Sequence, residues 1–386
     1  MSTVRARVWR FTIDKGKAGA GAVRAVEIGQ GPLPVSLAAM VNINALACDL
    51  RATVHQRVRD HEIRLLLSYI TRNQSMGPLN ADCSALDSSA GHIKRFVSEC
   101  TGLGVMSAAS EFLFDWTHTT SGLSSFDVLP GKLHGAYATT GVRPDLLYDL
   151  DDGPLAGEAR GRRRKAKQMF PAGKGTPDQK KRLEELARWS VSHSDHAYFM
   201  SWVWLGPGGI GVDIFLPDDS TALPGLRTDW IDTPGGPQPW EFDVPGTARP
   251  SGGGTRPDRS PVTTPPRVSV QASVRAAISR VGPAAEKAMN RAFGREDNQI
   301  GKLAGVPVRG RWIRGDTLGA ARHEVLLAVL GERVELARPS PHQRLAGLTG
   351  DRLDTYLDGR LLTAVRPVRG PRPGWDRISA ELLELS

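Results

Sequence analysis

Residues 143–167 read RPDLLYDLDDGPLAGEARGRRRKAK, and this stretch decides the fold that we expect for the chain. The dipeptide Asp152-Gly153, set between two runs that alternate apolar and polar residues, is the strongest short signal for a β-hairpin. With these two residues as the turn, Leu146 lies opposite Ala159, and the apolar side chains of both strands share one face. The stretch therefore predicts an antiparallel hairpin with one buried face.

The other face of this hairpin carries the charged side chains Asp145, Glu158 and Arg160. Diagonal neighbours on one face of an antiparallel pair lie roughly 7 Å apart at the backbone. Two carboxylates at that separation repel each other unless a cation lies between them. Mg²⁺, with Mn²⁺ as an alternative, is a hard ion that uses one or two protein carboxylates together with phosphate oxygens. The pattern indicates a metal site; the alternative is a surface hairpin in which Arg160 pairs with both carboxylates.

The residues after the hairpin predict one helix and two strands. PDQKKRLEELARWSVS at 177–192 begins with Pro and Asp and carries apolar residues at helical spacing. AYFMSWVWL at 197–205 is apolar on both faces, which is typical of a strand inside a sheet. GPGGIG at 206–211 is a turn that leads into the strand VDIFLP at 212–217. The order predicts an α/β (α+β) core in which a central mixed sheet is flanked by helices.

Several other segments have a recognisable period. Residues 5–13 predict a strand, and the three- and four-residue spacing within 36–70 predicts helix. Residues 89–116 predict a helix that breaks at the GLG of 102–104. The stretch TLGAARHEVLLAVLG at 317–331 has a helical pattern. Further predictions are a helical pattern at 272–293 and strands at 305–315 and 360–370.

Composition divides the chain into four regions. A Pro- and Gly-rich stretch is the clearest boundary, and the residues after it hold about +7 of the net charge of +9. We therefore expect an N-terminal strand and helical region at 1–88, the core at 89–217, a linker or excursion at 218–266, and a separate basic α+β C-terminal domain at 267–386.

The net charge of +9 favours nucleic acid as a partner. No apolar run approaches the roughly 20 residues that cross a bilayer, and the N-terminus has no signal-peptide pattern. We therefore expect no membrane partner and a cytoplasmic location. The run GRRRKAK at 161–167 is either a solvated loop or a set of phosphate contacts. With the start of the following helix, it gives these candidates for nucleic-acid binding: Arg162, Arg163, Arg164, Lys165, Lys167, Lys180, Lys181 and Arg182.

Other motifs carry less chemistry. His193 and His196 lack a third metal ligand at a recognisable spacing, so we interpret them as part of a polar linker. His323-Glu324 lacks the second His of a zinc-binding HExxH helix. Trp202 belongs to the core in our interpretation, because it lies on the strand expected inside the sheet.

Pro144-Asp145, a short gap and Glu158-Ala159-Arg160 resemble the PD-(D/E)xK motif of the restriction-endonuclease-like nuclease superfamily. The order strand, strand, helix, strand is also similar to the core of that superfamily, and the resemblance covers residues 89–217. It implies that Asp145 and Glu158 bind Mg²⁺ or Mn²⁺ and that Glu111 supplies an acidic group from an earlier helix. Arg160 stands where the family has Lys; it stays charged and does not readily act as a base.

The resemblance implies a metal-dependent DNA endonuclease that hydrolyses phosphodiester bonds, with a role in bacterial defence against foreign DNA. Asp145 and Glu158 would bind the ion, and Arg160 would stabilise the developing charge. The alternative is a catalytically inactive nucleic-acid-binding or scaffold subunit of a larger complex, which the Arg in place of Lys favours. A third possibility, glycoside hydrolysis by the two carboxylates, fits the basic surroundings poorly. The C-terminal domain would bind DNA, a partner protein or a second copy of the chain.

Overall fold

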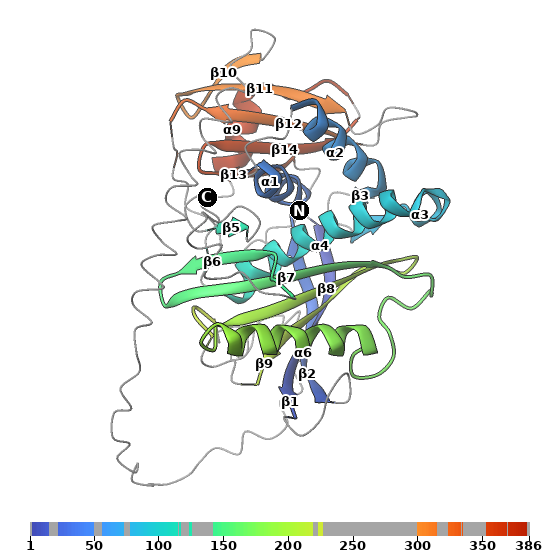
Figure 1. Ribbon diagram of the computed structural model, residues 1–386. Coiled ribbons are helices and arrows are strands. Elements are labelled where there is room, and N and C mark those ends of the chain that lie inside the picture. Colours follow the sequence, from blue (N-terminus) through green and yellow to red (C-terminus); the bar gives the residue numbers. More distant parts are fainter. Residues whose placement is uncertain are drawn as a thin grey trace, which may run out of the picture.

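The computed structural model of the chain (Figure 1) contains a seven-stranded and a five-stranded β-sheet, with helices between and outside them, and a small two-stranded sheet. It describes residues 2–14, 22–49, 56–72, 78–114, 116, 123–125, 142–218, 223–226, 299–314, 323–332, 334, 353–368 and 370–383. Within these ranges, no helix is both long enough and apolar enough to span a bilayer. The predicted linker lies almost entirely outside the described residues, as does the helical pattern predicted at 272–293.

The larger sheet is mixed, as the sequence predicts. Its seven strands follow the order β2 (Val23–Val35), β1 (Ser2–Ile13), β9 (Gly209–Pro217), β8 (Tyr198–Gly206), β7 (Gly153–Arg163), β6 (Leu146–Leu150) and β5 (Leu123–Ser125). The pairs β1–β9 and β7–β8 are parallel, and the other neighbours are antiparallel. All nine residues of β8 are buried, which confirms a strand in the middle of a sheet. The N-terminal strands β1 and β2 extend this sheet beyond β9.

Helices cover both faces of the larger sheet. Helix α6 (Pro177–Ser192) has the predicted bounds, because Thr176 and Gln179 form a capping box and Pro177 occupies the first turn. Its apolar side chains pack with Trp9, Trp202 and other residues of one face of the sheet. Helix α4 (Gly91–Leu113) packs on the opposite face. The sheet therefore lies between α6 and α4 (Figure 1).

The predicted break at GLG is wrong, since α4 continues through both glycines. A Cβ atom on Gly102 would lie 2.9 Å from the backbone N of Gly161 in β7. A Cβ atom on Gly104 would lie 2.3 Å from Cγ of Met40 in α1 (Leu37–Asp49). The two glycines thus permit close packing of the helix between β7 and α1, and their sequence signal reflects tertiary contact rather than a turn.

The predicted register of the hairpin is also wrong. The turn consists of Asp151 and Asp152, and Leu146 pairs with Gly157 instead of Ala159. Gly153 begins β7 with a φ of 139°, so the glycine supplies the unusual backbone angle just after the corner. The shift amounts to two residues. Because side chains alternate with a period of two, every side chain keeps the face that the sequence predicts.

The second sheet is antiparallel, with the order β10 (Gln299–Leu303), β11 (Val306–Arg314), β12 (His323–Leu330), β14 (Leu361–Pro367) and β13 (Asp354–Asp358). Strands β11 and β14 confirm the predictions at 305–315 and 360–370. The helix predicted at 317–331 is wrong, because its described residues form β12, in which all eight residues are buried. A short run that is apolar on every side fits a buried strand as well as a helix. Helix α9 (Trp375–Leu383) packs on one face of this sheet.

The predicted helical segment at 36–70 comprises α1 and a second helix, α2 (Gln56–Tyr69), followed by β3 (Ile70–Arg72), β4 (Leu79–Ala81) and α3 (Cys83–Ser88). Helix α1 lies against both α4 and the second sheet. Asp354 of β13 accepts hydrogen bonds from the Ser36 hydroxyl and the Leu37 amide, each at 2.7 Å, and so caps α1. One apolar core therefore extends from the larger sheet through α1 and α4 to the second sheet.

Candidate active site

Asp145 directly precedes β6, and Glu158 lies on the neighbouring strand β7. The Asp145 amide donates to the carbonyl of Gly157 at 3.0 Å, and its carboxylate accepts from the Ala159 amide at 2.8 Å. These two bonds bracket Glu158, so the observed register brings Asp145 beside Glu158 rather than opposite Arg160. The Glu158 side chain lies on the side of the sheet that α6 covers, because Ala156, two residues earlier on β7, packs with α6.

Two arginines contact the same oxygen of Glu158. Arg160 Nε, on the same strand, lies 2.7 Å from Glu158 Oε1. Arg182 reaches that oxygen from α6 and donates to it from Nε at 2.7 Å and from Nη2 at 2.5 Å. The structure therefore brings together four of the predicted site residues, Asp145, Glu158, Arg160 and Arg182.

Glu158 is fully buried, and its second oxygen, Oε2, has no hydrogen-bond partner among the residues that the structure describes. The pKa of Glu158 is raised to about 8, mainly because the group is buried and also because of the negative charge of Asp145, although Arg160 and Arg182 oppose the shift. A buried carboxylate oxygen without a donor is costly unless a proton, a water molecule or a cation satisfies it. Oε2 is therefore the position at this site that is suited to such a group.

Glu111 does not join this pair. It lies on α4, on the other side of the larger sheet from α6, and its Oε1 accepts a hydrogen bond from the Tyr356 hydroxyl of β13 at 3.2 Å. Across the described ranges, no group of three His, Cys, Asp or Glu residues is arranged to hold a metal ion. A cation at this site would thus have Asp145 and Glu158 as its carboxylate ligands from the protein.

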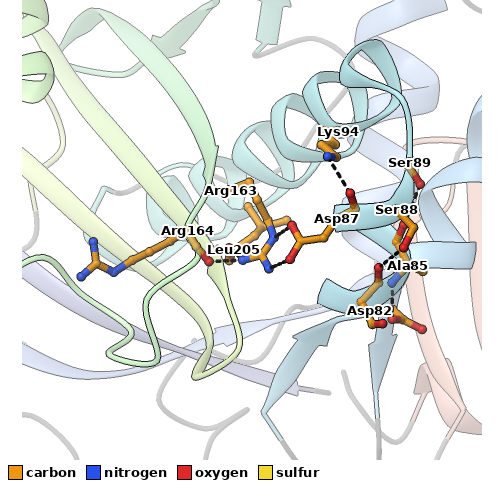
Figure 2. Close-up of polar contacts among 10 residues, drawn as sticks. Asp82, Ala85, Asp87, Ser88, Ser89, Lys94, Arg163, Arg164 and Leu205 are labelled. Carbon is orange, nitrogen blue, oxygen red and sulfur yellow. Dashed lines mark hydrogen bonds and ion pairs between the residues drawn. The ribbon is translucent and has the colours of Figure 1, made fainter.

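Arg163 has an internal role in the structure (Figure 2). Its guanidinium group pairs with Asp87 of α3 through two bonds, at 3.0 and 2.7 Å, and donates to the carbonyl oxygens of Arg164 and Leu205. Lys94 of α4 donates to the Asp87 carbonyl oxygen at 2.8 Å. This predicted phosphate contact therefore joins the end of β7 to α3.

The other basic candidates have different surroundings. Arg164 donates to the Gln168 carbonyl oxygen at 2.8 Å, and Arg162 lies over the ring of Trp202, with its Cζ 5.5 Å from the ring centroid. Lys165 and Lys167 are exposed and lie beside the β8–β9 turn, where a Cβ on Gly208 would be 2.5 Å from the Lys167 carbonyl oxygen. Glu158 pairs with Met200 near the start of β8, whereas this turn follows the end of β8. The two lysines therefore lie at the opposite end of β8 from Glu158. On α6, Lys181 is exposed and Lys180 is half-buried.

A buried carboxylate that the sequence reasoning missed lies under the start of α6. Asp213 of β9 accepts hydrogen bonds from these four side chains: Arg7 Nε at 2.7 Å, Trp9 Nε1 at 2.9 Å, Gln179 Nε2 at 2.9 Å and Trp204 Nε1 at 2.8 Å. A polar residue on a strand that is otherwise apolar was the only signal for it. Because both oxygens of Asp213 are satisfied, this cluster has the character of a structural network.

Residues 193–196 form the turn that links α6 to β8, as we interpret them from the sequence, but His196 is not one of its exposed residues. The ring of His196 is buried and lies 5.2 Å, centroid to centroid, from the ring of Trp189. Burial lowers the pKa of His196 to about 4. His196 is therefore neutral inside the protein at ordinary pH.

Comparisons of the chain with protein-family models, with curated proteins and with solved structures found no match.

Proposed function

We propose that the protein is a metal-dependent DNA endonuclease of the restriction-endonuclease-like superfamily, acting in the cytoplasm on foreign DNA. The observation that supports the proposal best is that Arg160 and Arg182 both contact Glu158, while the Asp145 carboxylate accepts from the amide of the next residue, Ala159, and acts on the pKa of Glu158. The order of helix α4, strands β5, β6 and β7, helix α6 and strand β8 is also consistent with the motif resemblance.

The donor set suits a hard divalent cation. Mg²⁺ needs only one or two protein carboxylates, since waters and substrate phosphates supply the other ligands. Asp145 and the unsatisfied Oε2 of Glu158 would hold the ion. When bound, such an ion neutralises phosphate charge and lowers the pKa of a bound water.

The remaining chemistry belongs to the chain itself. Arg160 and Arg182 carry permanent charges, so they would bind the non-bridging oxygens of the phosphate that is cut. The exposed Arg162, Lys165, Lys167 and Lys181 would hold the flanking backbone and give an affinity that depends on salt.

The decisive experiment compares DNA cleavage by isosteric variants. Plasmid and linear DNA are incubated with Mg²⁺, with Mn²⁺ or with EDTA. The proposal predicts metal-dependent cleavage that Asp145→Asn and Glu158→Gln each abolish. Asp152→Asn is the matched control, because Asp152 is exposed in the turn of the same hairpin. Cleavage that survives in Asp145→Asn and Glu158→Gln would refute the assignment of the site.

A binding-only subunit is the second candidate, and one observation favours it. Arg160 and Arg182 both contact Oε1 of Glu158, so this carboxylate oxygen has its partners without any metal ion. In that case the wild-type protein binds DNA in EDTA and leaves it intact at every metal concentration. The same incubation therefore separates the two functions.

A further inference from the structure

Arg182 contacts two carboxylates that differ in depth. Its Nε and Nη2 atoms bond to Glu158, which is fully buried, while its Nη1 atom lies 3.5 Å from Oε2 of Glu185, whose side chain is 29% exposed. Glu185 lies one turn further along α6, where an i, i+3 pair meets on the helix surface. The guanidinium group therefore has an inner partner and an outer partner within its reach.

The helix that carries Arg182 is firmly held at its start. Gln179, three residues earlier, accepts from the Thr176 amide through its Oε1 at 2.7 Å and donates to Asp213 through its Nε2 at 2.9 Å. The backbone of the first turn is thus fixed to the sheet. A change of partner by Arg182 requires only rotation of its side chain.

Two guanidinium groups already occupy the site without a ligand. Arg160 and Arg182 both contact Oε1 of Glu158, and Arg182 also lies beside Glu185. A divalent cation at Glu158 Oε2 would add two positive charges beside two guanidinium groups, and this repulsion is large where burial lowers the dielectric constant. A phosphate group brings the negative charge that removes the imbalance.

From this arrangement we propose that Arg182 couples cation binding to phosphate binding. It holds Glu158 in the absence of a polyanion and moves toward Glu185 and the phosphate when DNA binds. Arg160 lies on the same strand as Glu158, whereas Arg182 reaches Glu158 from α6 and has a second carboxylate, Glu185, within reach. We therefore expect Arg182 to be the arginine that moves. This inference deepens the proposed function and rests on it for the metal site.

The test measures binding rather than cleavage. Mn²⁺ binding is followed by the electron paramagnetic resonance signal of the free ion, with and without a duplex oligonucleotide. DNA binding is measured separately in EDTA. In Arg182→Gln we expect Mn²⁺ to bind at least about tenfold more tightly without DNA, because one adjacent positive charge is gone, and we expect DNA to bind more weakly in EDTA.

Three further variants complete the design. Arg188→Gln is the control on the same helix, since Arg188 is 68% exposed and pairs with Glu184; both affinities should be unchanged. Arg182→Lys keeps the charge and should keep weak Mn²⁺ binding in the absence of DNA. Glu185→Gln removes the outer partner, so Mn²⁺ should bind more weakly than to the wild type, and this variant still tests the proposal if Arg182→Gln does not fold.

Opposite changes of the two affinities in Arg182→Gln support the coupling role. Mn²⁺ binding that is unchanged or weaker in that variant overturns it, because Arg182 then serves only to hold Glu158 in place. No Mn²⁺ binding by any of the proteins overturns both the coupling role and the metal site. Tight Mn²⁺ and DNA binding without cleavage leaves the coupling role intact and refutes only the nuclease function.

Discussion

Gln179 donates a hydrogen bond from its side-chain amide to Asp213 across 2.9 Å, and this contact joins the first turn of α6 to β9. Gln179 is also the third residue of the helix, where its side chain forms the capping box with Thr176. One side chain therefore caps α6 and attaches it to the sheet. Arg182 follows three residues later and reaches Glu158. The geometry of the candidate site therefore depends on a cluster that contains none of its predicted residues.

The first prediction concerns this cluster. Asp213→Asn replaces an oxygen acceptor with an amide donor in front of Arg7, two indole N–H groups and Gln179. We expect the free energy of unfolding to fall by about 3–5 kcal/mol, the typical effect of breaking a buried charged pair from one side. Urea denaturation measures the change. Asp178→Asn, in the exposed first turn of α6, should cost less than about 1 kcal/mol; similar losses in the two variants would contradict the prediction.

The parts of the fold that the sequence predicted correctly are those set by local chemistry. The bounds of α6 follow from Thr176 and Pro177, and β8 follows from an unbroken apolar run. The faces of the hairpin follow from alternation with a period of two, which survives a register shift of two residues. For this reason Asp145 and Glu158 were predicted to share a face even though the predicted pairing was wrong.

The parts that the sequence did not predict correctly depend on contacts between distant segments. The glycines of α4 resemble a break until β7 and α1 are packed against them. Strand β2 contains Gly and Pro residues that weaken its signal, and it forms by pairing with β1. The approach of Arg182 to Glu158 and the position of Glu111 on the opposite side of the sheet are likewise results of packing, which no spacing in the sequence specifies.

The second prediction concerns the glycines of α4. An Ala in place of a helical Gly normally stabilises a helix by about 1 kcal/mol. Gly102→Ala should instead destabilise the protein, because the new Cβ would lie 2.9 Å from the backbone N of Gly161, and a strand inside the sheet cannot easily move away. Gly91→Ala, at the start of the same helix with nothing within 4 Å of the new Cβ, should stabilise the protein. Thermal unfolding of both variants measures the two signs, and a stabilising Gly102→Ala would show that β7 yields.

The third prediction concerns pH and His196. In the unfolded chain His196 binds a proton below its ordinary pKa of 6.5, whereas in the folded protein it does so only near pH 4. Because the unfolded state binds more protons within this window, the contribution of His196 to stability is complete above pH 6.5 and is lost as the pH falls toward 4. The loss is on the order of 3 kcal/mol.

The measurement is the difference between wild type and His196→Gln in urea denaturation from pH 7 to pH 4.5. Other titrating groups, Glu158 included, are present in both proteins and cancel in the difference. The variant is expected to be less stable at pH 7, since it disturbs the packing against Trp189. The difference in the free energy of unfolding between the two proteins should become smaller or change sign by pH 4.5. A constant difference from pH 7 to pH 4.5 would show that His196 does not titrate in this range.

The last prediction separates the internal basic residues from the exposed ones. Each Lys or Arg that neutralises a DNA phosphate adds about 0.9 to the slope of log affinity against log salt. Lys165→Ala with Lys167→Ala should therefore lower that slope by roughly 2 units and leave the stability of the protein nearly unchanged, because both side chains are exposed.

Arg163→Ala should leave the salt dependence unchanged and lower the stability of the protein. Its guanidinium group is occupied by Asp87 and by two carbonyl oxygens (Figure 2), so the slope should be retained while unfolding becomes easier by about 1–2 kcal/mol. Fluorescence anisotropy at several salt concentrations, together with urea denaturation, measures both effects. A loss of slope in Arg163→Ala would show that Arg163 leaves Asp87 when DNA binds.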